Sequence, residues 1–246
     1  LPQPLVNAGL DQTICAGTGA TLNATGAATY VWNNNVIQGV PFFPTASQIY
    51  TVTGTGANGC TNVDQVQVTV STGPSVTVSA AQTVCANAAA TFSAVPQNSL
   101  GGYWTTSGNG TISPNISSAA ITYLPAANDP VVVTLTYVAT NACGSSSSAT
   151  NVNVLPIPTV NAGPDQVLCE PNGATPSEVT LNGSGALTYT WDNSAQNGVP
   201  FTPPVGQTTF TVTGTDANGC VDTDQLVVTS LTLPVANGAV SDAYGN

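Results

Sequence analysis

The stretch Leu1–Cys15, LPQPLVNAGLDQTIC, returns later in the chain as Leu155–Cys169, LPIPTVNAGPDQVLC, with ten of fifteen positions identical. The agreement continues downstream, where YTVTGTGANGC (Tyr50–Cys60) is matched by FTVTGTDANGC (Phe210–Cys220). Long-range self-similarity of this kind is typical of chains built from similar structural units in series. We therefore predict two copies of one domain, separated by a different stretch.

These repeats divide the 246 residues into four parts. We name residues 1–71 the first segment, residues 72–154 the middle segment, and residues 155–230, the copy of the first, the third segment. Residues 231–246 are expected to be a linker or the start of another repeat, because Leu233 begins the pattern again. Proline stands at each junction and presets an extended backbone, so we expect the domains to follow one another along stiff connectors. The chain has no initiator Met, and we expect it to be a piece of a longer polypeptide.

Strand-forming residues dominate the composition, and no stretch keeps a 3.6-residue apolar period. Val66, Val68 and Val70 alternate with polar residues, as expected for a strand with one buried face. Asn58-Gly59 stands before this strand and is a strong hairpin-turn signal. Six or seven short strands in each segment predict a small sandwich. The fold class is therefore predicted as all-β, a tandem array of small immunoglobulin-like β-sandwich domains.

Charge is scarce, and all of it is negative. The chain has 11 Asp and Glu residues and no Lys, Arg or His, whereas about 60 charged residues are usual at this length. Without a cation it cannot neutralise phosphates, which argues against nucleic-acid binding. It has no imidazole for a catalytic triad, and no apolar run approaches the length of a membrane span. We predict that it is not an enzyme and does not insert into a membrane.

The six cysteines fall two to a segment. If each segment folds independently, one bridge per segment is the simplest pairing. Each such bridge would stabilise its domain by about 4 kcal/mol and would place the protein outside the cytosol. An immunoglobulin topology does not by itself make the two positions adjacent, so their geometry stays open. The expected pairs are Cys15–Cys60, Cys85–Cys143 and Cys169–Cys220.

The motifs VNAGxDQxxC, YTVTGTxANGC and DQVxVTV resemble the PKD-like domains of Bacteroidota surface proteins. The middle segment, with ISPNISSAAITYLPAAND and VVVTLTYVATNAC, resembles the Ig-like repeats found beside them. The resemblance covers nearly the whole chain. It implies a stalk or filament segment of a large cell-surface adhesin or gliding-motility-associated protein, exported by the type IX system.

Two alternatives to a structural or adhesive array stay open. The first is an accessory glycan-binding or spacer module, because the family is also attached to secreted hydrolases. The second is a filament subunit that assembles by strand exchange, through residues 231–246 or the N-terminal stretch. The expected partners are neighbouring domains of the array or identical subunits, with surface polysaccharide as a further possibility.

Two kinds of side chain are candidate sites. One tryptophan stands at a similar place in each segment, and we expect each of them to fill a core rather than to form a sugar platform: Trp32, Trp104 and Trp191. The recurring carboxylates are expected to cap turns or to accept backbone hydrogen bonds. Calcium is the alternative ligand and the one candidate cofactor, with these candidate residues: Asp11, Asp64, Asp165, Asp216, Asp222 and Asp224.

Overall fold

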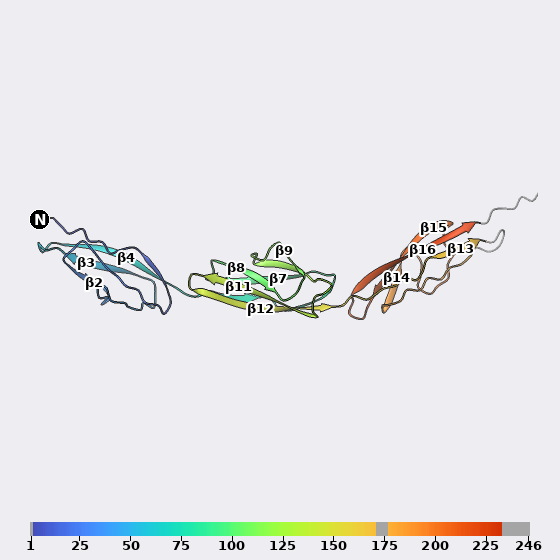
Figure 1. The fold of residues 1–246 in the computed structure, drawn as a ribbon, viewed down its shortest axis with the longest axis horizontal. Helices are drawn as coiled ribbons and strands as arrows, with labels where there is room; N and C mark the ends of the chain where they lie inside the picture. The colour runs from blue at the N-terminus through green and yellow to red at the C-terminus, as the bar shows by residue number, and fades with distance from the viewer. Residues whose placement is uncertain (1, 171–176, 233–246) are drawn as a thin grey trace, which may run out of the picture. The chain divides into compact units, whose positions relative to one another are not determined.

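A computed structural model describes residues 2–170 and 177–232 of the protein (Figure 1). None of these residues lies in a helix, so the described part contains no helix that could cross a membrane. Their strands form four sheets of four strands. Every regular element of these residues is a strand, which confirms the predicted fold class, an all-β array of small immunoglobulin-like sandwiches.

The sheet of the first segment has the order β1-β4-β3-β2. The first strand runs parallel to β4, and the other two pairings are antiparallel. Asn58-Gly59 lies in the hairpin between β3 and β4, as predicted. The strands of this sheet are β1 (Gln12–Cys15), β2 (Thr29–Trp32), β3 (Gln48–Thr55) and β4 (Thr61–Ser71).

The third segment repeats this sheet with the order β13-β16-β15-β14. Its first strand again runs parallel to the long last strand. The strands are β13 (Gln166–Glu170), β14 (Thr188–Trp191), β15 (Gly206–Thr215) and β16 (Val221–Thr232).

The middle segment contains two sheets. One has the order β5-β7-β10-β9 and the other β6-β12-β11-β8. The strands of the first are β5 (Ser75–Val78), β7 (Ala90–Gln97), β9 (Thr111–Ser113) and β10 (Ala120–Leu124). The strands of the second are β6 (Gln82–Cys85), β8 (Gly101–Thr106), β11 (Val132–Asn141) and β12 (Gly144–Leu155).

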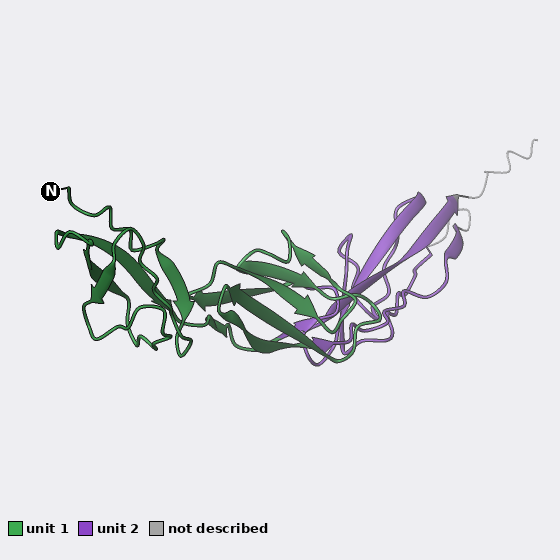
Figure 2. Ribbon diagram, turned by 60° about the vertical axis from the view of Figure 1, so that its left-hand side comes forward, with its two compact units in different colours: residues 1–82, 89–153 green, residues 83–88, 154–246 purple. Residues whose placement is uncertain are grey.

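By its internal contacts the chain divides into two compact units (Figure 2). Unit 1 holds residues 1–82 and 89–153, and unit 2 holds residues 83–88 and 154–246. Unit 2 thus contains all of β6 except Gln82, and also Val154, the last residue of the middle segment. The division into three domains at residues 71 and 154 stays a prediction. The expected start of a further repeat falls largely on residues 233–246, which lie outside the described residues.

The core of the first segment lies between its sheet and a second, thinner layer. Val52, Val66 and Val68 from the sheet are fully buried and pack with Leu22 of the opposite layer. That layer is held by isolated bridges rather than by long strands. Alternation in the sequence therefore predicts the sheet well and the second layer poorly.

The close approach of the two layers requires glycine at one turn. Gly26 has φ +89°, and a Cβ atom there would collide with the carbonyl group of Leu5. Gly185 repeats this geometry against Thr159 in the third segment. Only glycine adopts this conformation without cost and leaves room for the neighbouring backbone.

Candidate functional site at the segment ends

The two cysteines of the first segment lie at opposite ends of its longest strand. Cys60 directly precedes β4, whereas Cys15 is in register with Ser71 at the end of β4. A strand rises about 3.3 Å per residue, so the ten steps of β4 span roughly 33 Å. A disulfide needs Cα atoms within about 7 Å. Cys15 and Cys60 therefore cannot bridge each other.

The third segment has the same arrangement. Cys220 directly precedes β16, and Cys169 is in register with Leu231 near the end of that strand. In the middle segment, Cys143 likewise directly precedes the last long strand, β12. We call cysteines in the position of Cys60, Cys143 and Cys220 hairpin cysteines, because each belongs to the turn before the last strand. Those at or next to the end of the short strand that opens each of these sheets, Cys15 (β1), Cys85 (β6) and Cys169 (β13), are the first-strand cysteines.

The structure joins the first-strand cysteine of one segment to the hairpin cysteine of the next. Cys15 is bridged to Cys143, with Cα atoms 5.4 Å apart. Cys85 is bridged to Cys220, with Cα atoms 5.6 Å apart. The first bridge lies within unit 1 and the second within unit 2. All three predicted pairs, Cys15–Cys60, Cys85–Cys143 and Cys169–Cys220, are therefore wrong.

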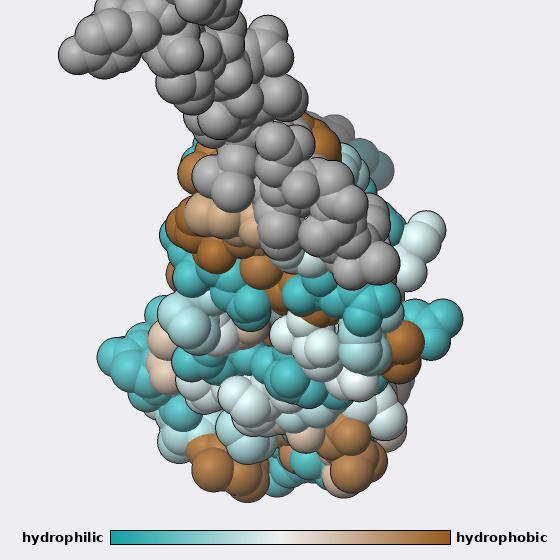
Figure 3. All heavy atoms as spheres, turned by 90° about the vertical axis from the view of Figure 1, so that its right-hand side faces the viewer, coloured by the Kyte–Doolittle hydropathy of each residue, from teal (hydrophilic) through white to brown (hydrophobic). Residues whose placement is uncertain are grey.

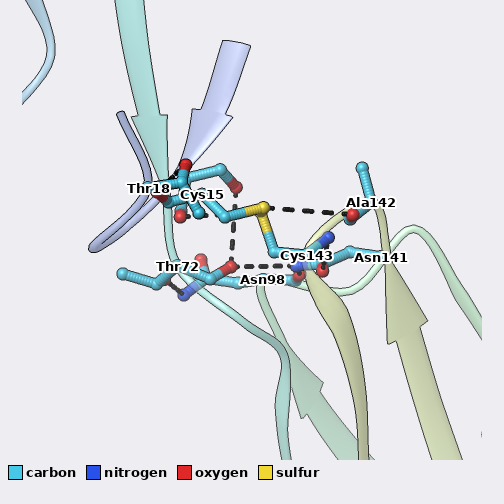
Figure 4. Close-up of a disulfide and its surroundings, with 8 residues drawn as sticks. Cys15, Thr18, Thr72, Asn98, Asn141, Ala142 and Cys143 are labelled. Carbon is cyan, nitrogen blue, oxygen red and sulfur yellow. Dashed lines mark hydrogen bonds between the residues drawn. A yellow bond between two sulfur atoms is a disulfide. The ribbon is translucent and has the colours of Figure 1, made fainter. Parts of the chain in front are cut away.

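Polar contacts surround the Cys15–Cys143 bridge (Figure 4). Asn141 donates its side-chain amide to the carbonyl oxygens of Thr72 (2.9 Å) and Asn98 (2.6 Å), and its Oδ1 accepts the Cys143 N–H (2.7 Å). The Cys15 sulfur lies 3.9 Å from the Ala142 carbonyl oxygen. Since a bridged sulfur has no proton to donate, this is a packing contact. The amide of Asn141 thus fixes the turn that presents Cys143.

Backbone and side-chain amides also surround the Cys85–Cys220 bridge in unit 2. The N–H of Ala86 donates to the Leu155 carbonyl oxygen (2.8 Å). Asn87 donates its side-chain amide to the Val221 carbonyl oxygen (3.3 Å), next to Cys220. Asp216 accepts the N–H groups of Asn218 and Cys220, both at 2.8 Å. The predicted turn-capping role is confirmed for Asp216.

The recurring VNAGxDQ motif positions the first-strand cysteine. The Asp64 carboxylate accepts the Ala8 N–H at 2.7 Å, and Asp11 accepts the Gln67 N–H at 2.8 Å. Both hydrogen bonds join the chain before β1 to β4. Cys15 is thereby held at the far end of the sheet.

The same two bonds recur in the third segment. Asp224 accepts the Ala162 N–H at 2.8 Å, and Asp165 accepts the Val227 N–H at 2.8 Å. A carboxylate in a chain without cationic side chains must find its partners on the backbone, in water or in a bound cation. The backbone supplies the partner at all four positions.

The structure does not assemble the predicted calcium site. Among the described residues no three Asp, Glu, Cys or His side chains are grouped so that they could hold a metal ion. Five of the six candidates accept a hydrogen bond from a backbone N–H group. The sixth, Asp222, is half-buried on β16. Calcium needs six to eight converging oxygen ligands, and the oxygens of these side chains are held by separate backbone groups.

These backbone bonds predict a sensitivity to acid. The Ala8 and Gln65 N–H groups lower the pKa of Asp64 below its usual value of 3.8, and the Ala162 and Gln225 N–H groups lower the pKa of Asp224. A lowered pKa in the folded state adds stability above about pH 4, and this is lost as the pH falls through the folded pKa. Carboxyl titration by NMR should place both groups below 3.8. Values at or above 3.8 would contradict the backbone bonds.

Asp129 is a half-buried carboxylate that no sequence motif indicated. Burial alone would raise its pKa, but the Tyr123 hydroxyl and the N–H groups of Ala126, Asn109 and Gly110 together lower it. The Tyr123 Oη donates to Asp129 at 2.6 Å, and burial raises the pKa of Tyr123. Asp129 does not recur in the other segments, so no repeat pointed to it. It holds the turn after β10 in place.

All three tryptophans lie in the core, as predicted. Their exposed fractions are 5% for Trp32, 1% for Trp104 and 9% for Trp191. Trp32 donates its indole N–H to Gln38 at 2.7 Å, and Trp191 donates to Asn197 at 3.1 Å. A sugar platform needs an exposed aromatic face. These rings therefore give no support to the predicted polysaccharide partner.

The surface of the described residues has shallow hollows. One, of about 350 Å³, is lined by residues including Phe92, Pro114 and Ile121, and another by Pro2, Pro4 and Asn58. Neither lining contains a carboxylate or a thiol, and a third hollow of about 200 Å³ is lined by one carboxylate, that of Asp11, without a second. Apolar side chains on the face drawn in Figure 3 occur in small groups between polar ones. Small exposed apolar groups of this kind are normal on protein surfaces.

Comparisons with known proteins give similarities of fold only. No family model and no curated protein matches the chain. Among solved structures it is similar to the titin fragment I67-I69 (13% identity, 93% of this chain and 98% of that one, TM-score 0.48). It is also similar to mouse cadherin-23 EC22-24 (12%, 94% and 99%, TM-score 0.39) and to Sidekick-1 immunoglobulin domains 1-5 (14%, 94% and 59%, TM-score 0.45).

Proposed function

We propose that the chain is a structural segment of a secreted repeat protein, in which disulfides join each β-sandwich to the next. One observation carries this proposal. Both bridges, Cys15–Cys143 and Cys85–Cys220, connect the first-strand cysteine of one segment to the hairpin cysteine of the following one. A bridge within a domain stabilises only that domain, whereas a bridge between successive domains adds covalent continuity along the array.

The two bridges interlock along the sequence, because Cys85 lies between Cys15 and Cys143. A pulling force applied at the chain ends is therefore carried by a covalent path through the two disulfides, which is shorter than the full backbone. It runs 14 residue steps from Leu1 to Cys15, 58 steps back from Cys143 to Cys85, and 26 from Cys220 to Asn246. Most of the chain is excluded from this path, even when every sheet has unfolded. Such a segment resists lengthening, which suits a stalk or filament.

The finer assignment rests on the sequence motifs. We propose that the parent protein is a Bacteroidota cell-surface adhesin or gliding-motility-associated protein exported by the type IX system. Structural disulfides persist in oxidising surroundings, which supports an extracellular location. The chain itself would act as a spacer without catalytic activity. Antibody labelling of intact cells tests this, and labelling that persists without that export system would contradict it.

A single-molecule pulling experiment tests the structural role. A fully unfolded chain reaches roughly 3.5 Å per residue. The 245 steps of the reduced chain should then extend to about 860 Å, and the 98 steps of the oxidised path to about 350 Å including the bridges. The measurement is the final contour length with and without a reducing thiol.

Two further pulls serve as controls. A Cys85→Ala variant keeps the Cys15–Cys143 bridge, so its path contains 117 steps and should reach about 410 Å. A Cys60→Ala variant should match the oxidised parent chain, because neither bridge contains Cys60. If the oxidised chain extends as far as the reduced one, the proposed continuity is absent.

A further inference from the structure

Cys169 occupies the same place in the third segment as Cys15 in the first. The parallel pairing sets Cys15 opposite Ser71 and Cys169 opposite Leu231. In each case the partner residue stands seven positions after the aspartate of the strand, Asp64 or Asp224. The two cysteines therefore have the same register on the same sheet.

The two other first-strand cysteines are both bridged, and their surroundings agree. The residue after Cys15, Ala16, donates its N–H to the carbonyl oxygen that ends β4 (2.8 Å), and Ala86, after Cys85, donates to the one that ends β12 (2.8 Å). Each of these cysteines takes a hairpin cysteine from the following segment. Cys169 is exposed and belongs to neither bridge. The position thus has one kind of partner wherever a following segment is present.

We propose that Cys169 is a coupling site, which forms a disulfide with the hairpin cysteine of a following β-sandwich. The inference rests on the proposed serial array and names its next partner. That partner is a turn of the Asn-Gly-Cys or Asn-Ala-Cys kind placed directly before a long last strand, as in Asn218–Cys220 and Asn141–Cys143. It belongs either to the continuation of the same polypeptide or to a second copy of this chain.

The bond forms by thiol–disulfide exchange, so the oxidant is a disulfide. The Cys169 thiolate attacks one sulfur of the donor and releases a thiol, which leaves a mixed disulfide on Cys169. The hairpin thiolate of the partner then displaces the second donor thiol and forms the new S–S bond. Two protein thiols are oxidised, one donor disulfide is reduced to two thiols, and the two protons pass to those thiols.

The spacing of the existing bridges gives a position for the partner. They join residues 128 and 135 positions apart. In a polypeptide that continues beyond Asn246, the partner cysteine should therefore stand about 128 to 135 residues after Cys169 and directly precede a strand. In a second copy the corresponding turn is Asn58–Cys60 of the first segment, which has the same Ala-Asn-Gly-Cys sequence as residues 217–220.

The test starts from the full chain, concentrated in a glutathione redox buffer, and from the natural polypeptide purified without reductant. Both are quenched with a thiol-blocking reagent and digested with pepsin, and the disulfide-linked peptides are identified by mass spectrometry. We expect Cys169 joined to a hairpin cysteine, downstream in the natural polypeptide or Cys60 of a second copy. The two starting materials distinguish these sources.

Two variants separate coupling from general thiol oxidation. Cys169→Ser should abolish the product. In the double variant Cys169→Ser/Val167→Cys the thiol moves two residues back on β13, to a side chain that is 65% exposed in the parent chain. This keeps an exposed thiol on the same strand but moves it about 6.6 Å. We expect at least a tenfold lower yield of the bridge to a hairpin cysteine.

Three results would overturn the proposal: a Cys169 thiol that is unbridged in both materials, a Cys169–Cys169 bridge as the main product, or an equal yield from the double variant. The same digest reports Cys15–Cys143 and Cys85–Cys220. If those bridges are present while Cys169 has no partner, the coupling site fails and the proposed function stands. If those two bridges are missing as well, both proposals fail.

Discussion

Replacing Cys143 by alanine is expected to release one additional reactive thiol, on Cys15, more than 120 residues away along the chain. The reason is the bridge between these two residues, which spans 128 positions. In the chain-entropy treatment, opening a loop of that length removes about 5 kcal/mol of stability. The loss should appear in unit 1, which contains both cysteines. Maleimide labelling of the unfolded, unreduced chain followed by peptide mapping identifies the thiol, and thermal unfolding reports the loss.

The matched control is Cys60→Ala. It removes the cysteine that shares a segment with Cys15 but belongs to neither bridge, so it should leave the labelling of Cys15 unchanged. A bridge within the first segment predicts the reverse pattern. If Cys60→Ala exposes Cys15 and Cys143→Ala does not, the pairing described above is incorrect.

Replacing Trp104 by alanine should destabilise the middle segment by about 3–5 kcal/mol, the range for removing a large aromatic side chain from a core. Trp104 is 1% exposed, packs edge-on against Tyr137 with ring centroids 5.3 Å apart, and donates its indole N–H to the Ser118 carbonyl oxygen at 3.0 Å. The cavity, the lost ring contact and the unsatisfied carbonyl group all act in the same direction. The loss in unfolding free energy is measured by urea titration monitored by circular dichroism.

Tyr103 provides the control on the same strand. It precedes Trp104 on β8 and is 42% exposed, because successive strand residues point to opposite faces. Tyr103→Ala should change the unfolding free energy by roughly 1 kcal/mol or less. Equal losses for the two variants would contradict the core position of Trp104 and would reopen a role for this ring at the surface.

Local patterns in the sequence were sufficient to predict much of this fold. The alternation of Val66 and Val68 predicted a strand with one buried face, and both side chains are fully buried. Asn58-Gly59 predicted the hairpin before that strand. The carboxylate of Asp64 was expected to need a backbone, water or cation partner in a chain without cationic side chains, and it accepts the Ala8 N–H. Each of these predictions depends on residues close in sequence or on a simple rule of charge.

The disulfide pairing depends on information of longer range. Counting two cysteines per segment assumed that each domain closes its own bridge, which ignores the length of the strand between them. Cys60 stands before a strand of 11 residues, and Cys15 lies beside the end of that strand only because β1 pairs with β4 in parallel. The strand length could be estimated from the sequence, whereas the parallel pairing could not. Together they exclude Cys15–Cys60.

The calcium alternative likewise depends on information that the sequence does not contain. Asp216, Asp222 and Asp224 are close in sequence, and Asp222 and Asp224 share one face of β16, but the oxygens of Asp216 and Asp224 accept N–H groups from separate stretches of backbone. Asp216 caps its own turn, while Asp224 reaches back to the Ala162 N–H on the chain before β13. Proximity in sequence therefore did not produce convergence in space. Side-chain direction, rather than residue type, decides whether such a group can bind a metal.

Disulfide mapping of the unreduced chain tests the central claim most directly. The chain has no Lys or Arg for trypsin, so pepsin at low pH, which also suppresses exchange of thiols, is the suitable protease. The account predicts one linked peptide pair containing Cys15 and Cys143 and another containing Cys85 and Cys220. Linked peptides that instead join Cys15 to Cys60 and Cys85 to Cys143 would contradict it.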